Sequence, residues 1–154
     1  MEESVVESVV ESGVKLKILG EAGYDYAMLG LSLNKNQTIE AMPVLAEKLA
    51  PLGGGHNKFL ESIDVWLDIT VPRYIWQDLD TYRMTTKQSE STNHTIMKGP
   101  LTTNNFVYQD ITKIDLEYLN HLISECNFLR LKRNLPEGFL QRRIWKLNYS
   151  NIRM

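Results

Sequence analysis

The chain has 154 residues, 43% of them hydrophobic and 23% charged, which fits a globular domain with a buried core and argues against a disordered chain. No apolar run reaches the roughly 18 residues of a membrane helix, and the N-terminus is acidic where a signal peptide is basic, so we expect a cytoplasmic protein with no membrane partner. The one cysteine, Cys126, excludes an internal disulfide and a cysteine-based metal site, and we expect it in the core.

The net charge of −2 conceals a basic C-terminal end. Residues 130–154 carry seven Lys or Arg against Glu137 alone, whereas the rest of the chain carries ten against eighteen acids. This split is typical of an end that faces an anion, although a solvated helix face would give the same pattern. Because no recognisable nucleic-acid-binding module accompanies these residues, we do not expect nucleic acid as a partner.

The first 50 residues predict a tail, a strand and two helices. Residues 1–13 repeat Glu-Ser-Val-Val, and we interpret them as an acidic tail before a single domain over 14–154. The alternation in 14–19, VKLKIL, predicts a half-buried strand that ends at Gly20. A helix is then expected over 21–33, with one apolar face made of Ala22, Tyr26, Leu29 and Leu33. The next helix begins at Pro43, because an interior proline would break it.

The middle of the chain has the most specific pattern. Apolar residues at alternate positions predict a strand, and they are Val65, Leu67, Ile69 and Val71. A helix can start at Pro72, since the missing N–H of proline would be unpaired there anyway. Upstream, the glycines at 53–55 suit either a close approach of the backbone to a ligand or a plain hinge. Downstream, residues 85–95 form a polar loop.

Two further helices are expected near the C-terminus. Asp115 can cap a helix over 116–129, whose apolar face is Leu119, Leu122, Ile123, Cys126 and Leu129. Residues 106–111 form a short strand or an irregular segment, and the last helix begins at Leu135-Pro136 and holds Phe139, Leu140, Ile144 and Leu147. The whole pattern predicts an α+β fold, a small, mostly antiparallel sheet with helices packed on it.

The polar loop could hold a phosphate group. Arg83 stands just before hydroxyl and amide side chains at 85–93, and such groups hold phosphate oxygens when an arginine supplies the charge. A plain surface connection has the same composition. The three histidines, His56, His94 and His121, have no metal-ligand spacing, and no nucleophile elbow is present, so we assign no metal site and no catalytic residue.

Residues 81–94 resemble the signature of the flavin-dependent thymidylate synthases, Arg-His-Arg-x-x-Ser-x-Asn-Glu-x-Ser-x-Arg-Tyr. Arg83 and Ser91 match the second arginine and the second serine, Thr86 can replace the first serine, and Gln88 can replace the asparagine. Tyr82 stands in the place of the histidine. The first Arg, the Glu and the last Arg of the signature are absent.

The same family carries Gly-His-x-Ser-x-x-Glu-His upstream, which His56 and Glu61 match in spacing. The run Leu135–Arg143 resembles a phage-type branch of this family. The whole resemblance covers roughly residues 14–152. It implies the fold of the thymidylate synthase complementing proteins and a nucleotide or cofactor site. The implied site residues are Arg83, Ser91, Thr86, Gln88, Tyr82, His56, Glu61, Arg142 and Arg143.

The family transfers a methylene group from a folate to dUMP with reduced FAD, at sites shared between subunits of a homotetramer. The resemblance therefore implies a dUMP-like nucleotide, FAD and homo-oligomerisation. Four signature side chains are replaced, and the chain ends at Met154, where the family continues into a helix with a substrate-binding arginine. We therefore expect little or no synthase activity. The alternative is a non-catalytic phage-type protein that sequesters a nucleotide or inhibits a host defence or metabolic protein in the host cytoplasm.

Overall fold

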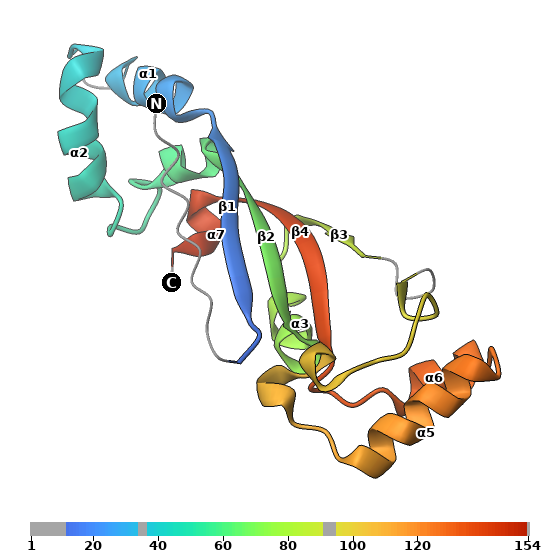
Figure 1. Ribbon diagram of the computed structural model, residues 1–154. Helices are drawn as coiled ribbons and strands as arrows, with labels where there is room; N and C mark the ends of the chain where they lie inside the picture. The colour runs from blue at the N-terminus through green and yellow to red at the C-terminus, as the bar shows by residue number, and fades with distance from the viewer. Residues whose placement is uncertain (1–11, 34–36, 91–94, 154) are drawn as a thin grey trace. The chain divides into compact units, whose positions relative to one another are not determined.

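The computed structural model describes residues 12–33, 37–90 and 95–153 (Figure 1). Four strands form an antiparallel sheet in the order β1-β2-β4-β3, namely β1 (Lys15–Ala22), β2 (Asp64–Pro72), β3 (Thr86–Ser89) and β4 (Leu140–Asn148). The helices are α1 (Tyr24–Leu33), α2 (Met42–Leu49), α3 (Arg73–Leu79), α5 (Lys113–Ser124), α6 (Phe128–Asn134) and α7 (Tyr149–Ile152). Short 3-10 turns are η1 (Ile39–Ala41), η2 (Lys58–Ser62), η3 (Thr103–Asn105) and η4 (Val107–Gln109). The predicted α+β fold is thus confirmed.

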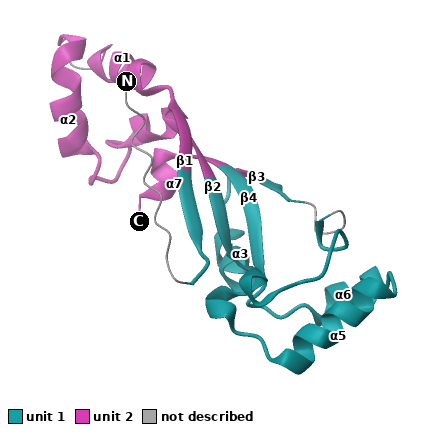
Figure 2. Ribbon diagram, viewed as in Figure 1, with its two compact units in different colours: residues 1–17, 68–83, 87–145 teal, residues 18–67, 84–86, 146–154 magenta. Residues whose placement is uncertain are grey.

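The chain divides into two compact units (Figure 2). Unit 1 comprises the described parts of residues 1–17, 68–83 and 87–145, and unit 2 comprises those of 18–67, 84–86 and 146–154. The boundaries fall inside the strands, so each unit contains part of the sheet. The single domain expected over 14–154 stays a prediction. Across the described part of the chain, no helix combines the length and the apolar character needed to cross a membrane.

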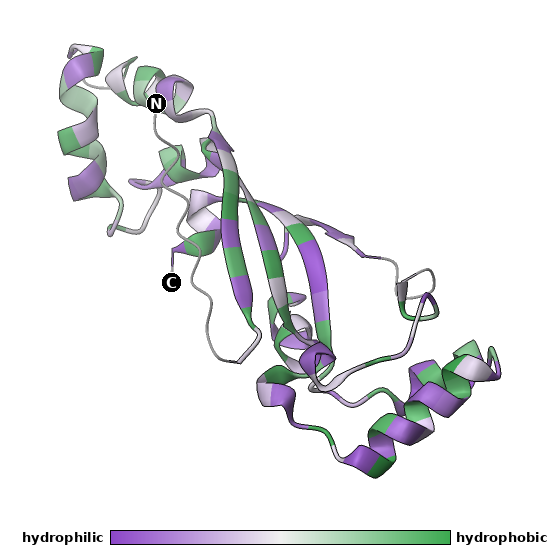
Figure 3. Cartoon of the chain, viewed as in Figure 1, coloured by the Kyte–Doolittle hydropathy of each residue, from purple (hydrophilic) through white to green (hydrophobic). Residues whose placement is uncertain are grey.

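Strand β2 confirms the predicted alternation. Its predicted apolar residues are buried, and the residues between them are only partly buried, because successive side chains of a strand point to opposite faces. Figure 3 shows the hydropathy of the residues changing along β2. The helix predicted over Leu135 to Leu147 is wrong, since β4 occupies most of that range. There Trp145 and Leu147 are buried on either side of the half-exposed Lys146, which is the period of a strand.

Unit 1 has its own core of Phe106, Leu119, Leu122, Leu131, Phe139 and their neighbours. The helix predicted over 116–129 is instead α5 and α6. Thr112, rather than Asp115, caps α5, its hydroxyl accepting a hydrogen bond from the backbone N–H of Asp115 at 3.1 Å. Cys126 interrupts the run with a left-handed φ of 52°, and it is exposed, so its expected core position is wrong.

Unit 2 packs α1 against α2 and η2. The buried face of α1 is Ala27, Met28 and Leu31, whereas the predicted Tyr26 and Leu33 are 79% and 77% exposed. Strand β1 also continues through Gly20 to Ala22, so α1 begins at Tyr24 and not at residue 21. Helix α2 has Pro43 in its first turn, as predicted.

The segment β1 is less buried than its alternating sequence predicts. Leu16, Ile18 and Leu19 are 40%, 56% and 48% exposed. Among the described strands, β1 is an edge of the sheet and pairs only with β2. Of the predicted tail, residues 1–11 lie outside the described residues, and Ser12 is tied to unit 1 by a hydrogen bond from the Tyr108 N–H to its carbonyl at 3.0 Å.

Candidate functional site

The polar face of the sheet in unit 1 is organised around Arg142 on β4. Its guanidinium donates two hydrogen bonds to the Asp68 carboxylate on β2, from Nε at 2.8 Å and from Nη2 at 2.6 Å. The side chain of Asp68 is 16% exposed and that of Arg142 is 58% exposed. The carboxylate therefore holds the guanidinium on its protein side, and the rest of the guanidinium faces solvent. A forked, two-point contact of this kind fixes the plane of a guanidinium.

Electrostatics keep both partners charged. The hydrogen bonds from Arg142 lower the pKa of the Asp68 carboxyl below its usual range, against the opposing effect of burial, and the charge of Lys17 acts in the same direction. The hydrogen bonds to Asp68 raise the pKa of Arg142. Within the described residues no acceptor is bonded to the second terminal nitrogen of Arg142, Nη1, which is therefore the donor that could meet a ligand.

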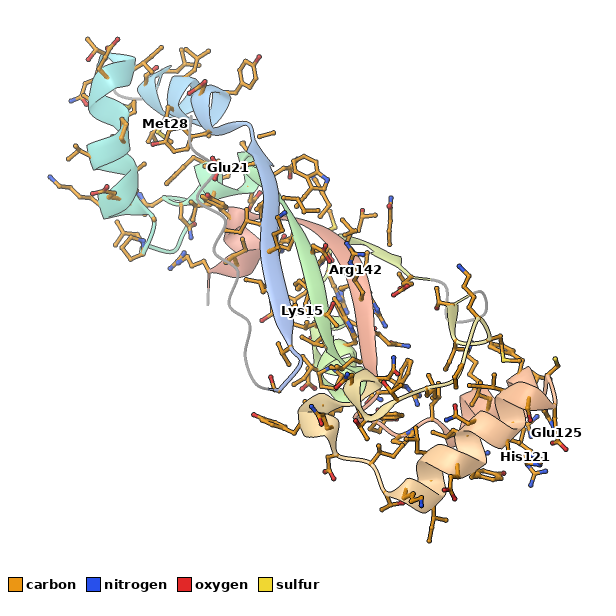
Figure 4. All side chains as sticks on the ribbon, viewed as in Figure 1. Lys15, Glu21, Met28, His121, Glu125 and Arg142 are labelled. Atoms are coloured by element: carbon orange, nitrogen blue, oxygen red, sulfur yellow. The ribbon has the colours of Figure 1, made fainter. Side chains whose placement is uncertain are left out.

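Three cavities of unit 1 share Arg142 and Glu90 in their linings. Their volumes are about 430, 480 and 330 Å³. The first adds the cation of Lys98, the hydroxyl of Thr95 and the amide of Asn105, and the second adds Lys15, which Figure 4 labels beside β1. These are the donors that recognise a phosphate or another oxyanion beside a sugar-sized space.

Glu90 limits what these cavities accept. Its backbone N–H donates to the Arg142 carbonyl at 3.1 Å, which places the carboxylate at the same cavities, and its charge contributes to raising the pKa of Arg142. An anion in the first cavity therefore meets Lys98 and Arg142, and an anion in the second meets Lys15 and Arg142, with Glu90 in the lining of both. The arrangement favours a ligand that carries both an anionic group and hydrogen-bond donors.

Arg143 serves a different cluster from Arg142. Its Nη1 lies 3.0 Å from Asp80, and its guanidinium carbon lies 4.4 Å from the centre of the Trp76 ring. Its Nε is buried and has no hydrogen-bond partner within the part of the chain that the structure describes. Consecutive residues of a strand point to opposite faces, which explains the separation. Both arginines do line the 330 Å³ cavity beside β3, together with Gln88.

Two residues of the resemblance segment pack on Trp145. The Tyr82 and Trp145 rings are edge to face with centres 5.8 Å apart. The Lys87 ammonium lies 4.7 Å from the centre of the same ring and 3.4 Å from Asp80. Tyr82 is thereby held against the protein interior.

The remaining predicted site residues are dispersed. Arg83 and Thr86 are exposed, and Arg83 forms no ion pair with any described residue. Ser91 lies outside the described residues. In unit 2, the exposed His56 lines a cavity of about 440 Å³ with Tyr26, Lys58 and Phe59, while Glu61 lies in η2. Of the predicted set, the structure brings together Gln88, Arg142 and Arg143.

The sequence reasoning missed the acids that hold the arginines. Asp68 and Asp80 each pair with one of them, and Glu90 lines the cavities. The sequence did contain a signal for them. Asp64 and Asp68 are four residues apart on β2, as Arg142 and Lys146 are on β4, so each pair lies on one face of its strand. Lys146 lies 2.6 Å from Asp64. Reading it required β4 to be recognised as a strand. The described residues contain no group of three or more His, Cys, Asp or Glu suited to a metal ion.

Comparison with known proteins rests on three-dimensional structure. The sequence matches no protein-family model and no curated protein. The fold is similar to two structures of the flavin-dependent thymidylate synthase ThyX from Helicobacter pylori with FAD and dUMP. One has a TM-score of 0.74 and 17% identity over 89% of this chain and 80% of that chain. The other has a TM-score of 0.73 and 18% identity over 89% and 79%.

A third similar structure is a UMP/dUMP methylase, PolB from Streptomyces cacaoi, bound with 5-Br UMP. Its TM-score is 0.63, with 10% identity over 90% of this chain and 73% of that chain. The chain therefore has the fold of the flavin-dependent thymidylate synthases.

Proposed function

We propose that the protein binds a pyrimidine nucleoside monophosphate of the dUMP class at the cavities around Arg142. The observation that carries this proposal is that Arg142, fixed by the partly buried carboxylate of Asp68, lines the three cavities described above, which also hold Lys15, Lys98 and Asn105. The similar structures were solved with dUMP or a uridine monophosphate analogue, which supports the choice of ligand. Arg142 and Lys98 would meet the phosphate, and Asn105 could donate to a sugar or base oxygen.

The described residues support a flavin less well than they support a nucleoside monophosphate. In the resemblance, Tyr82 stands where the family has histidine, and its ring is packed on Trp145. Lys87, which follows in the same segment, is paired with Asp80. Neither side chain is presented to a cofactor phosphate, so FAD, which the resemblance implies, stays a prediction, and no redox step is assigned. A flavin absorption band that remains after incubation with FAD and removal of the free flavin would support that prediction, and its absence would count against it.

The proposal is therefore one of binding with little or no thymidylate synthesis. Binding without conversion would also agree with the alternative interpretation, in which a non-catalytic protein sequesters a nucleotide. Inhibition of a host protein and a phage origin stay predictions. Homo-oligomerisation is also proposed, because apolar side chains such as Ile18, Tyr26 and Leu33 are exposed. Light scattering after size-exclusion chromatography measures that state, and a monomeric mass would contradict it.

Two matched variants test the site. Arg142→Gln and Lys146→Gln each remove a β4 cation paired with a β2 carboxylate, but only Arg142 lines the cavities. We expect the first to weaken dUMP binding by roughly tenfold or more and the second by less than about twofold. Because Arg142→Gln leaves Asp68 without its partner, Arg142→Lys provides a variant that keeps the charge and loses the fork. Equal dUMP affinities for wild type and both Arg142 variants would contradict the proposed site.

A further inference from the structure

A separate cavity of unit 1, of about 230 Å³, is lined by cations on the α3 side. Its lining residues are Arg73, Trp76, Gln77, Asp80, Lys132, Leu135, Gln141 and Arg143. Arg73 comes from the start of α3, Lys132 from α6 and Arg143 from β4, so three elements converge on it. Arg142 does not line this cavity, so a ligand bound here would not depend on the proposed nucleotide site.

The charges around the cavity do not balance. Arg73 lies 3.5 Å from Glu137, while Arg143 and Lys87 both pair with Asp80, at 3.0 and 3.4 Å. Lys132 has no carboxylate within ion-pair distance among the described residues, and its ammonium lies 5.8 Å from the Phe128 ring. Four cations thus share two carboxylates, which leaves positive charge in excess, because Lys132 has no acidic partner among the described residues and because Arg143 and Lys87 share Asp80.

Donors are also in excess over acceptors. The Nε of Arg143 is buried and has no hydrogen-bond partner among the described residues, although buried donors are nearly always paired in folded proteins. Arg73 is held rigidly, since its Nη1 donates to the Leu135 carbonyl at 2.6 Å. Trp76, which lies beneath the Arg143 guanidinium, donates from Nε1 to the Gln141 carbonyl at 2.9 Å. The guanidinium groups of Arg73 and Arg143 are therefore held in place before any ligand arrives, which favours binding.

We propose that this cavity binds a small oxyanion of the phosphate class, either inorganic phosphate or the phosphate group of a small monoester. Lys132 supplies the unbalanced charge, Arg73 and Arg143 supply planar guanidinium donors, and Gln77 supplies an amide. The volume admits one tetrahedral oxyanion and a short organic substituent, but not a whole nucleotide. The site is thus distinct in ligand size from the cavities around Arg142.

The test is a titration of the full chain with inorganic phosphate and, separately, with glycerol 3-phosphate, at constant ionic strength held by chloride. Backbone and indole N–H resonances are followed by NMR. We expect saturable shifts at Arg73, Gln77 and the Trp76 indole with at least one of the two ligands. The ligand that binds more tightly identifies the source of the phosphate group.

The matched variants are Lys132→Gln and Arg133→Gln, neighbours on α6 that each remove one positive charge, of which only Lys132 lines the cavity. Both are exposed, so neither change threatens the fold. Binding should weaken by roughly fivefold or more in Lys132→Gln and by less than about twofold in Arg133→Gln. The proposal is overturned if neither ligand gives saturable shifts, if the two variants lose affinity equally, or if Arg142→Gln abolishes the shifts while Lys132→Gln does not.

Discussion

At the scale of single residues, the site depends on how carboxylates hold arginines. Arg142 and Arg143 are adjacent in sequence, yet one is fixed by Asp68 on the polar face and the other by Asp80 beside Trp76. Because strand residues alternate between faces, two neighbouring arginines make two unlike sites. A basic run in a sequence therefore does not predict a single anion site.

The Asp68–Arg142 pair predicts a stability that depends on pH. A carboxyl whose pKa is lowered on folding stabilises the folded state above its ordinary value, near 3.9, and this contribution is lost as the pH falls through the lowered pKa. Asp68→Asn should thus lower the free energy of unfolding at pH 7 by about 1 kcal/mol, and the difference from wild type should vanish in acid. Urea unfolding across the acid range measures it.

The matched control is Asp110→Asn. Asp110 forms no ion pair with any described residue, so this variant should unfold as the wild type does. Equal free energies of unfolding for wild type and Asp68→Asn at neutral pH would show that the pair does not stabilise the fold.

Tyr149 predicts a loss of stability in alkali. Its hydroxyl donates a hydrogen bond to Glu21, and this bond, with burial, raises the pKa of Tyr149 to about 12. The folded state holds the proton more tightly than the unfolded state, in which tyrosine ionises near pH 10, so stability present below about pH 10 is lost as the pH rises to about 12. Tyr149→Phe should remove this part of the alkaline loss in urea unfolding. A tyrosinate absorbance titration in which every tyrosine ionises near pH 10 would contradict the assignment.

At the scale of elements, a backbone constraint fixes the junction of β1 and α1. Gly23 has a φ of 95°, and a Cβ added there would lie 2.2 Å from the Ser62 carbonyl oxygen. Both the left-handed conformation and the close approach require glycine. This residue, rather than Gly20, sets where the strand stops.

Replacement of Gly23 by alanine should therefore lower the free energy of unfolding by about 2 kcal/mol or more. Gly30→Ala is the control, because a Cβ at Gly30 meets nothing within 4 Å and α1 should gain up to about 1 kcal/mol from the better helix former. Thermal unfolding followed by circular dichroism compares the two. Equal destabilisation by both changes would mean that the contact with Ser62 does not constrain the chain.

The elements also show why some of the fold could be predicted and some could not. The strand at 64–72 was predictable, because both its period and its closing proline agree. The strand β4 was not, since Phe139, Leu140, Ile144 and Leu147 satisfy a helical spacing in a segment too short to exclude it. The break at Cys126 depends on Asn127, whose side chain caps α6 by accepting from the Arg130 N–H at 3.3 Å. Such a cap competes with the continuation of α5.

At the scale of the whole molecule, the resemblance correctly predicted the fold despite identities of 10 to 18% with the similar structures. The site was predicted less well, because its geometry depends on strand register. Register decides that Asp68 meets Arg142 and that Lys146 meets Asp64, and neither pairing follows from composition. Arg83 stays a predicted site residue, whereas Arg142, which the resemblance also implied, is held by Asp68 and lines the cavities of the polar face.

Calorimetric titration of the full chain with dUMP and with deoxyuridine tests the central claim most directly. The two ligands differ only in the phosphate, which Arg142 and its neighbouring lysines are proposed to recognise. We predict saturable binding of dUMP and binding of deoxyuridine that is weaker by roughly tenfold or more. No saturable heat with dUMP, or equal affinities for the two ligands, would contradict the account.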